Sequence, residues 1–439
     1  MNKLTVHSGH HHLQYENGSP FVYLGDTAWE LFHRCSREDV DFYLRDRASK
    51  GFTVIQAVAL AELDGIKSPN VYGDWPLSND DPTQPNEAYF AHVDWVVNRA
   101  NELGLQIGFL PTWGDKWNKG SWGAGPELFT PANAFHYGEW LGRRYKDADI
   151  IWILGGDRQL VTTEHVAIIR AMAEGLRKGD EGNHLITLHP MGGQSSSLSV
   201  HTETWLDFHM IQSGHQRDRD NYRMIEDDYL KLPARPVVEG EPGYEAHPNH
   251  FNQDHGMLDQ TDVRKSCYWA FFAGAAGYTY GCHAVWQMWD GVRTPINGPR
   301  APWKESLALP GAGQVQYARR LLESRPFFKR EPAQWMLWVD ARRGAEHLQC
   351  CRALDGSYAM VYIAEGNKIK VWPSKITGSH LHIWWYNPRN GTAVDEGLRE
   401  IKDDNCHFLP PFDPFGRDWV LVLDDASKGY PAPGTPWTK

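Results

Sequence analysis

Acidic, imidazole and indole side chains recur just after short apolar runs in the first three quarters of the chain. Asp157 and Arg158 follow one such run in WILGGDR, and Glu241 follows another in PVVEGEPGYE. Hydrolysis of a glycosidic bond needs one carboxyl group that protonates the leaving oxygen and a second that attacks or stabilises the anomeric carbon. Asp157 and Glu241 are therefore the predicted catalytic pair, and the two glycines before Asp157 let the backbone approach a ligand closely.

The other polar and aromatic residues at the ends of these runs suit a sugar pocket. Indole faces stack on the C–H faces of sugars, while carboxylate, amide and imidazole groups bind the hydroxyls. The predicted substrate-binding residues are Asp26, Trp29, Gln56, Trp113, Arg158, His189, His209, His283 and Trp286. Trp117 shares the loop of Trp113, whereas Trp122 and Trp289 are equally well explained as loop packing.

Three glutamates compete for the role of the second carboxyl. Glu239 and Glu241 share parity on an extended strand, so both can face the same side. We prefer Glu241 because it stands at the very end of the strand, whereas Glu239 lies one layer deeper and can pair with Arg235. Glu245 is the third candidate. Catalytic oxygens about 5–5.5 Å apart would indicate a retaining mechanism, and about 6.5–9.5 Å an inverting one.

The elements that must position these residues are predicted from β-branched and aromatic runs that alternate with amphipathic stretches. Eight strands are expected at 21–25, 52–58, 105–110, 150–155, 185–189, 207–211, 235–240 and 277–282. This alternation predicts an α/β fold, a (β/α)8 TIM barrel, in which the loops after the strands form the active-site face. Asp157 then follows the fourth strand and Glu241 ends the seventh. The fifth unit is the weakest, because 192–205 indicates a loop rather than a helix.

Start signals mark several of the outer helices. Ser36 and Thr261 stand where a helix N-cap is expected, and Pro131 stands where the missing N–H costs nothing. The segment 309–325 would supply the last outer helix. The hairpin signal Asn17-Gly18 predicts an N-terminal β extension that plugs the bottom of the barrel or pairs with the second domain.

From about residue 335 the pattern changes to strands without helices. Strands are expected at 347–353, 358–363, 368–372, 380–386 and 419–423, with closely spaced turn signals between them. This predicts an antiparallel β-sandwich. The domains are therefore 1–335, the catalytic barrel, and 336–439, the C-terminal sandwich, which we expect to buttress the barrel.

Composition narrows the possible partners. The chain has 439 residues, 20 of them Trp, and a net charge of −11, so nucleic acid is not an expected partner. No apolar run reaches 18 residues, and the N-terminal segment lacks a signal-peptide core, so we expect a cytoplasmic protein without membrane contact. Six Cys are too few for a disulfide framework and indicate buried free thiols. The sequence does not determine the oligomeric state.

Metal chemistry is the main rival interpretation. A zinc hydrolase would need clustered ligands, and His10, His11 and His12 precede the first barrel strand, where exposed or turn positions are expected. The remaining histidines are scattered, so we predict no metal and no cofactor. Two alternatives stay open: a metal-dependent barrel hydrolase and a barrel that binds glycans without cleaving them.

The motifs GDTAWELFHR, LPTWGDKW, WILGGDR and GEPGYE resemble the apiosidase-like glycoside hydrolases, family 140 and its relatives. The resemblance covers nearly the whole chain and implies a (β/α)8 barrel with a C-terminal domain of the collagen-binding type. It also implies that Asp157 is the acid/base and Glu241 the nucleophile. Characterised members release apiose linked to galacturonic acid in pectin, which implies a carbohydrate substrate from the plant cell wall.

Overall fold

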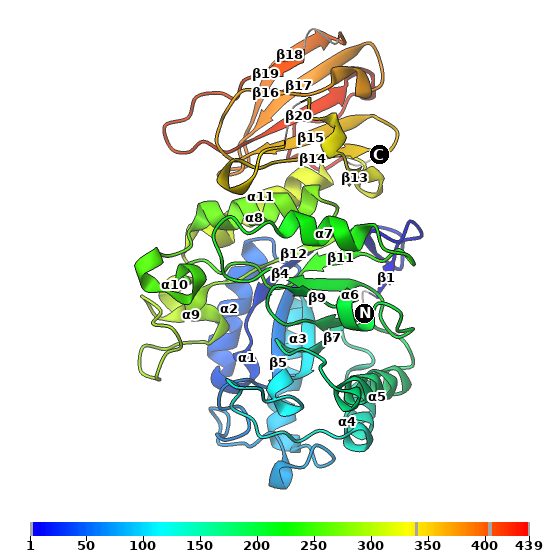
Figure 1. Ribbon diagram of the computed structural model, residues 1–439. Coiled ribbons are helices and arrows are strands. Elements are labelled where there is room, and N and C mark those ends of the chain that lie inside the picture. The colour runs from blue at the N-terminus through cyan, green and yellow to red at the C-terminus, as the bar shows by residue number, and fades with distance from the viewer. Residues whose placement is uncertain (1–2, 339–340, 403–405, 438–439) are drawn as a thin grey trace.

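The computed structural model describes residues 3–338, 341–402 and 406–437, which form a parallel barrel and an antiparallel domain stacked on one side of it (Figure 1). In Figure 1 the barrel lies below and the C-terminal domain, in orange and red, lies above. The predicted combination of a TIM barrel and a C-terminal antiparallel domain is confirmed.

Eight parallel strands form the barrel wall. They are β4 Tyr23–Thr27, β5 Val54–Leu60, β6 Gln106–Thr112, β7 Ile150–Gly155, β8 Ile186–His189, β10 His209–Gln212, β11 Val237–Glu239 and β12 Gly277–Tyr280. β12 pairs with β4, and the two ends of the sheet meet where the Asp207 N–H donates to the Ile186 carbonyl at 2.9 Å. The Thr187 hydroxyl also donates to the Phe208 carbonyl at 2.7 Å, so β8 and the chain entering β10 are joined.

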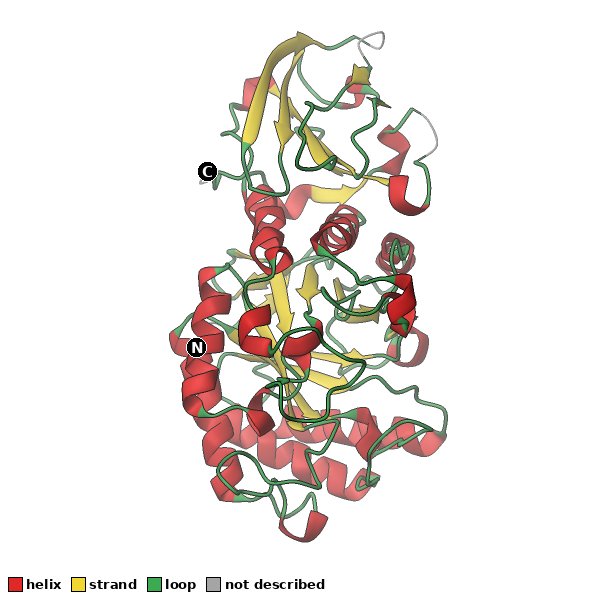
Figure 2. Ribbon diagram, turned by 90° about the vertical axis from the view of Figure 1, so that its left-hand side faces the viewer, coloured by secondary structure: helices red, strands yellow, loops and turns green. Residues whose placement is uncertain are grey.

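Helices cover the outside of the strands (Figure 2). The long ones are α2 Arg37–Ser49, α3 Glu87–Glu102, α4 Pro131–Tyr145, α5 Thr163–Gly179, α7 Asn221–Tyr229, α8 Gln260–Phe272 and α11 Pro310–Glu323. The fifth unit has only the short strand β9 Gln194–Ser195 and the four-residue helix α6 Ser197–Val200. The weak helical signal at 192–205 therefore reflected a unit that is mostly loop. Short helices α1 Leu31–Arg34, α9 His283–Trp286 and α10 Trp303–Ser306 lie in the loops after β4 and β12.

The predicted helix starts are confirmed in two cases and wrong in one. Ser36 accepts a hydrogen bond from the Asp39 N–H at 3.2 Å, and Pro131 is the first residue of α4. The helix predicted to start at Thr261 begins instead at Gln260, because the Asp259 carboxylate caps it and accepts from the Thr261 N–H at 2.7 Å. A carboxylate two residues upstream thus takes the place of the expected threonine cap.

An N-terminal antiparallel sheet closes the bottom of the barrel. It consists of β1 Leu4–Val6, β2 Leu13–Tyr15 and β3 Pro20–Phe21, with Gly18 at φ +83° in the predicted turn. Leu4, Leu13 and Phe21 are buried in one cluster with the interior side chains of the barrel strands. The plug interpretation is confirmed. The expectation for the neighbouring histidines fails at His12, which is buried against Phe327.

The C-terminal domain is built on a six-stranded antiparallel sheet. Its order is β13 Arg330–Pro332, β14 Leu348–Ala353, β15 Tyr358–Ile363, β20 Trp419–Asp425, β17 His380–Tyr386 and β18 Ala393–Glu400. A two-stranded sheet of β16 Ile369–Lys370 and β19 His407–Phe408 faces it across a separate apolar core. The sequence analysis missed β18, whose charged and mostly exposed residues are typical of an edge strand.

The other face of the six-stranded sheet packs on α8 and α11 of the barrel (Figure 1). Tyr268 of α8 stacks on Tyr362 of β15 with ring centres 4.9 Å apart. Arg264 of α8 donates two hydrogen bonds to Asp418, at 2.7 and 3.1 Å, and both side chains are buried. This shared apolar and ionic interface matches the buttressing role expected of the domain.

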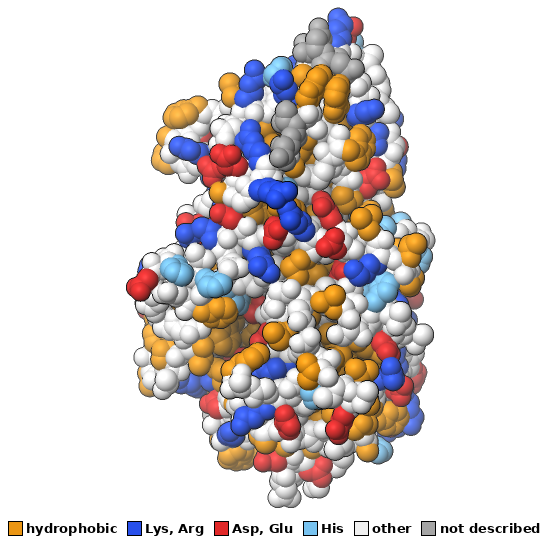
Figure 3. Space-filling view, in the orientation of Figure 1, with side chains coloured by type: hydrophobic (Ala, Val, Ile, Leu, Met, Phe, Trp, Pro, Cys, Tyr) orange, Lys and Arg blue, Asp and Glu red, His pale blue; other side chains and the backbone are white. Residues whose placement is uncertain are grey.

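All six cysteines are buried and free, as predicted. Acidic and basic side chains are interspersed on the face shown in Figure 3. Within the described residues, no helix combines the length and the apolar character needed to cross a membrane.

Candidate active site

A cavity of about 590 Å³ opens where the barrel strands end, and both predicted catalytic carboxyls line it. Asp157 follows β7 and Glu241 follows β11, so the two come from different parts of the barrel wall. Three predicted sugar-binding indoles line the same cavity: Trp29 after β4, Trp113 after β6 and Trp286 at the end of α9. The side chains that the sequence scatters over more than 250 residues therefore meet in one place.

The backbone before Asp157 has a conformation that needs glycine. Gly155 has φ +90°, and a Cβ there would lie 2.3 Å from the His189 carbonyl oxygen. Gly156 has φ +101°, and a Cβ there would lie 2.7 Å from the Gly114 nitrogen. Asp157 itself has φ +52°, a left-handed conformation that costs energy in a residue with a side chain. The strained turn places its carboxyl in the cavity.

The Asp157 carboxyl is held by neighbouring loops. Its Oδ1 accepts a hydrogen bond from the Gly192 N–H at 3.2 Å, and its Oδ2 lies 3.3 Å from the Arg158 guanidinium. Burial and the charge of Glu241 raise the pKa of Asp157 above its ordinary value, against the attraction of Arg158. A raised pKa favours the protonated form that a catalytic acid requires.

Glu241 has the opposite electrostatic environment. Its Oε2 lies 3.0 Å from Nε2 of His189, and its Oε1 lies 3.2 Å from Nε2 of His215. Burial alone would raise the pKa of Glu241, but the contacts with the two imidazoles outweigh it and lower the pKa well below the ordinary value. Glu241 is therefore ionised at neutral pH, as a nucleophile must be.

His189, at the end of β8, connects the Asp157 backbone to the Glu241 carboxyl. The Asp157 N–H donates to its Nδ1 at 3.3 Å, so the neutral ring carries its proton on Nε2, which faces Glu241. Trp29 meets the ring edge-to-face with centres 5.4 Å apart, and Trp113 lies at 5.7 Å. This packing fixes the imidazole.

Two further predicted residues lie directly behind the cavity lining. His283 accepts a hydrogen bond from the Trp286 indole N–H at 3.3 Å. Arg158 donates to the carbonyl of Asp157 at 2.7 Å, and its guanidinium lies 4.5 Å from the ring centre of Trp122. Both residues support the side chains that line the cavity.

Three predicted sugar-binding residues are placed elsewhere, which corrects the sequence analysis. Asp26 is fully buried and bonds to Tyr43 and Arg47 of α2. Gln56 donates to Thr279 at 2.7 Å and to the Gly240 carbonyl at 3.1 Å inside the barrel. His209 lies 3.0 Å from His201 and 3.3 Å from Ser196. The assignment failed because a position near a strand end does not reveal which way a side chain turns.

The competing glutamates are also separated by the structure. Glu239 is fully buried and accepts hydrogen bonds from the Ser213 N–H and from Asn221, both at 3.2 Å. Glu245 accepts from the Tyr280 hydroxyl at 2.6 Å and from the Gly311 N–H at 3.1 Å. Of the three, only Glu241 lines the cavity.

The sequence analysis missed several side chains of the cavity. They are Glu62, Arg219, Tyr244, His247, Phe251 and Asn297. Apart from Glu62, they come from long loops rather than from strand ends, and His215 is one of the scattered histidines. The available signal for Glu62 was its position two residues after β5.

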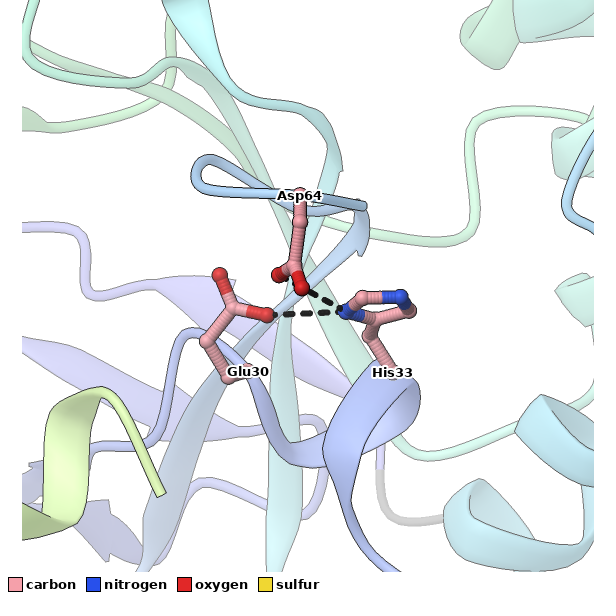
Figure 4. Close-up of side chains that lie close together, drawn as sticks. All are labelled: Glu30, His33 and Asp64. Carbon is pink, nitrogen blue, oxygen red and sulfur yellow. Dashed lines mark hydrogen bonds and ion pairs between the residues drawn. The ribbon is translucent and has the colours of Figure 1, made fainter. Parts of the chain in front are cut away.

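A possible metal cluster lies beside the cavity in the loops after β4 and β5 (Figure 4). Ligand atoms of Glu30, His33 and Asp64 lie within 4.8 Å of one another. Arg34 already supplies the positive charge, because its guanidinium lies 3.3 Å from Glu30 and 2.7 Å from Asp64. We therefore interpret the cluster as an ion-pair network.

The comparisons with solved structures define the class of protein. A crystal structure of a glycoside hydrolase family 5 protein from Bacteroides vulgatus is 29% identical, covers 100% of this chain and 96% of its own, and has a TM-score of 0.90. A second solved structure, a glycoside hydrolase, is 30% identical over 97% of both chains with a TM-score of 0.87. The fold is that of a glycoside hydrolase.

A family model described as "Apiosidase-like, catalytic domain" matches residues 7–329. The chain belongs to this apiosidase-like family. Residues 332–424 match a second model, described as "Putative collagen-binding domain of a collagenase". No curated protein matches the chain.

Proposed function

We propose that this glycoside hydrolase is a retaining enzyme that acts on pectic oligosaccharides, with Glu241 as the nucleophile and Asp157 as the acid/base. One observation carries the proposal: His189 accepts a hydrogen bond from the Asp157 N–H, and its Nε2 lies 3.0 Å from Glu241. These contacts hold one protonatable and one ionised carboxyl in the same cavity.

The reaction proceeds in two displacements. A Glu241 oxygen attacks the anomeric carbon as the glycosidic C–O bond breaks, and Asp157 gives its proton to the departing oxygen. Asp157, now ionised, then takes a proton from a water molecule that attacks the anomeric carbon and releases the Glu241 carboxylate. Trp29 and Trp113 cover the sugar ring.

A basic groove supports an acidic substrate. The groove has a volume of about 630 Å³ and shares Arg219, Gln216 and His250 with the catalytic cavity. Four arginines (Arg217, Arg219, Arg223 and, from the C-terminal domain, Arg343) line it against two aspartates, Asp218 and Asp220. Within the described residues, Nε of Arg219 is buried without a hydrogen-bond partner. A uronate carboxylate on the leaving-group side would satisfy it.

The catalytic assignment is tested with a panel of aryl glycosides and pectic oligosaccharides. We expect Asp157→Asn and Glu241→Gln to lose about 10²- to 10⁴-fold in kcat, and we expect the wild type to release its first product in the anomeric form of the substrate. Near-normal turnover of either variant, or an inverted product by NMR, would overturn the respective assignment. Binding without hydrolysis by the wild type would favour a glycan-binding barrel, and loss of activity with a chelator would favour a metal-dependent hydrolase.

The substrate class is tested separately with Arg219→Gln. This variant should raise KM for a uronate-containing oligosaccharide by about 10-fold or more and leave KM for a neutral aryl glycoside unchanged. Equal effects on both substrates would remove the argument for an acidic leaving group.

A further inference from the structure

Glu62 is a third carboxyl of the catalytic cavity, beside Asp157 and Glu241. The hydrogen bonds around it use the backbone: Lys116 donates to the Glu62 carbonyl at 3.1 Å, and the Leu63 N–H donates to Glu30 at 3.3 Å. Among the residues that the structure describes, none donates a hydrogen bond to the Glu62 carboxyl itself. The group is thus available to a ligand.

The surroundings of Glu62 keep its carboxyl protonated. Burial and the charge of Asp157 raise the pKa of Glu62 to about 8, although Arg158 acts in the opposite direction. A protonated carboxyl has one O–H donor and a free acceptor oxygen, which is the pair of functions that a sugar hydroxyl complements.

The loop that carries Glu62 is held rigidly. Figure 4 shows Glu30, His33 and Asp64, which tie this loop to the segment after β4. Arg34 binds the Asp64 carboxylate at 2.7 Å, and His33 lies 3.2 Å from the Ser68 carbonyl. A Cβ on Gly65 would lie 2.7 Å from the backbone of Ala61, so the turn itself is tight.

The position of Glu62 in the sheet points to the sugar. β5 lies between β4 and β6, and the loops after those two strands carry Trp29 and Trp113. Those two indoles contact each other, with ring centres 5.0 Å apart, and Glu62 lines the same cavity from the loop after β5. The side chain of Glu62 is half-buried, so its carboxyl faces the cavity and can bind a ligand that excludes water there.

We propose that Glu62 binds a hydroxyl group of the sugar whose glycosidic bond is cleaved, and that this contact selects the sugar that the site accepts. The inference rests on the proposed glycosidase function of the same cavity. Glu30, Arg34 and Asp64 are positioning residues that hold the Glu62 loop.

The test compares Glu62→Ala, Glu62→Gln and the exposed control Glu164→Ala on the aryl glycoside that the wild type cleaves fastest and on its monodeoxy analogues. Glu62→Ala should lower kcat/KM by about 10- to 100-fold, and Glu62→Gln should recover much of this loss because the amide both donates and accepts. For one deoxy analogue, kcat/KM should fall in the wild type but not in Glu62→Ala. This coupling is expected when the Glu62 carboxyl and the missing hydroxyl are in contact.

The outcomes separate this inference from the proposed function. Two results would overturn the role of Glu62: a kcat/KM of Glu62→Ala equal to that of the wild type, or equal losses of kcat/KM on the deoxy analogues in the wild type and in Glu62→Ala. The losses in Asp157→Asn and Glu241→Gln would still support the glycosidase. A wild type that cleaves no glycoside overturns both. If Glu62→Ala does not fold, the deoxy series on Glu62→Leu decides, because this variant keeps the volume of the side chain without its polar atoms and a contact that is only structural gives no analogue-specific coupling.

Discussion

The barrel mouth and the interface between barrel and C-terminal domain both bury polar groups, but the polar groups at the mouth are less completely paired. At the interface, Arg264 and Asp418 form two hydrogen bonds, and Arg325 pairs with Asp424 at 2.6 and 2.8 Å. At the mouth, the indole N–H of Trp113 is buried without a hydrogen-bond partner among the described residues.

This difference separates stability from function. Paired charges at the interface satisfy one another and fix how the two domains pack. Unpaired groups and a strained Asp157 at the mouth make the folded protein less stable than it could be, which is the arrangement expected where a ligand completes the contacts.

The largest expected effect is on catalysis at the barrel mouth. Asp157→Asn should reduce kcat by about 10²- to 10⁴-fold. Because the folded protein raises the pKa of Asp157, ionising this carboxyl costs stability above that pKa, so the variant should melt at or above the wild-type temperature at pH 7–8. Calorimetry and steady-state kinetics check both results. A lower melting temperature, relative to the exposed control Asp147→Asn, would contradict the comparison.

The second effect is on the stability that the interface between the domains contributes. Arg264→Met removes two of the hydrogen bonds to the buried Asp418, which keeps its contact with Arg389 at 2.7 Å, and should cost about 2–3 kcal/mol in the free energy of unfolding, with kcat/KM of the folded enzyme unchanged. Denaturant titration measures the loss. The control is Arg45→Ala, which breaks the surface pair of Arg45 and Asp41 and should cost at most about 1 kcal/mol. Similar losses in the two variants would show that the interface pair has no special role.

The third effect concerns pH and has opposite signs in the two regions. The pKa of Asp418 is lowered in the folded protein, so its stabilisation is present above its ordinary value of 3.8 and is lost as the pH falls below it. The pKa of Glu62 is raised from 4.5 to about 8, so stability is lost as the pH rises through this range.

Glu62→Gln removes the second dependence and sharpens the comparison. The melting temperature of Glu62→Gln relative to wild type should therefore increase from pH 5 to pH 8.5, which a thermal scan in matched buffers measures. A constant difference across this range would refute the argument.

The smallest effect concerns the rim. Trp122 is 57% exposed and lies under the Arg158 guanidinium. Trp122→Ala should raise KM by about 3- to 10-fold with little change in kcat, since the ring contributes binding area away from the reacting atoms. Trp75→Ala, another exposed tryptophan outside the cavity, is the control. A large fall in kcat for Trp122→Ala would place this residue closer to the chemistry.

Much of the fold could be predicted from the sequence. The eight barrel strands, the last outer helix, the N-terminal plug and five strands of the second domain follow from local patterns of apolar residues and turns. The edge strand β18 escaped detection because its charged residues face solvent on both sides. Two expectations stay predictions: the cytoplasmic location, and the domain boundary between residues 335 and 336.

The site was predictable only in part. Asp157, Glu241 and three indoles line one cavity because barrel topology brings strand ends together, and their roles stay predictions. Asp26, Gln56 and His209 were misassigned, since the side of the strand that each faces depends on which neighbour offers a better partner, such as Arg47 for Asp26.

The sequence by itself determined the barrel, the second domain and the types of group at the strand ends, because periodicity and turn chemistry are local. Only the tertiary structure decided that Glu241 rather than Glu239 lines the cavity, that His189 joins the Asp157 backbone to the Glu241 carboxyl, and that Glu62 is a third carboxyl of the cavity. Those facts depend on contacts between loops far apart in the chain, and burial and neighbouring charge set the ionisation of each carboxyl only after the fold has brought these loops together.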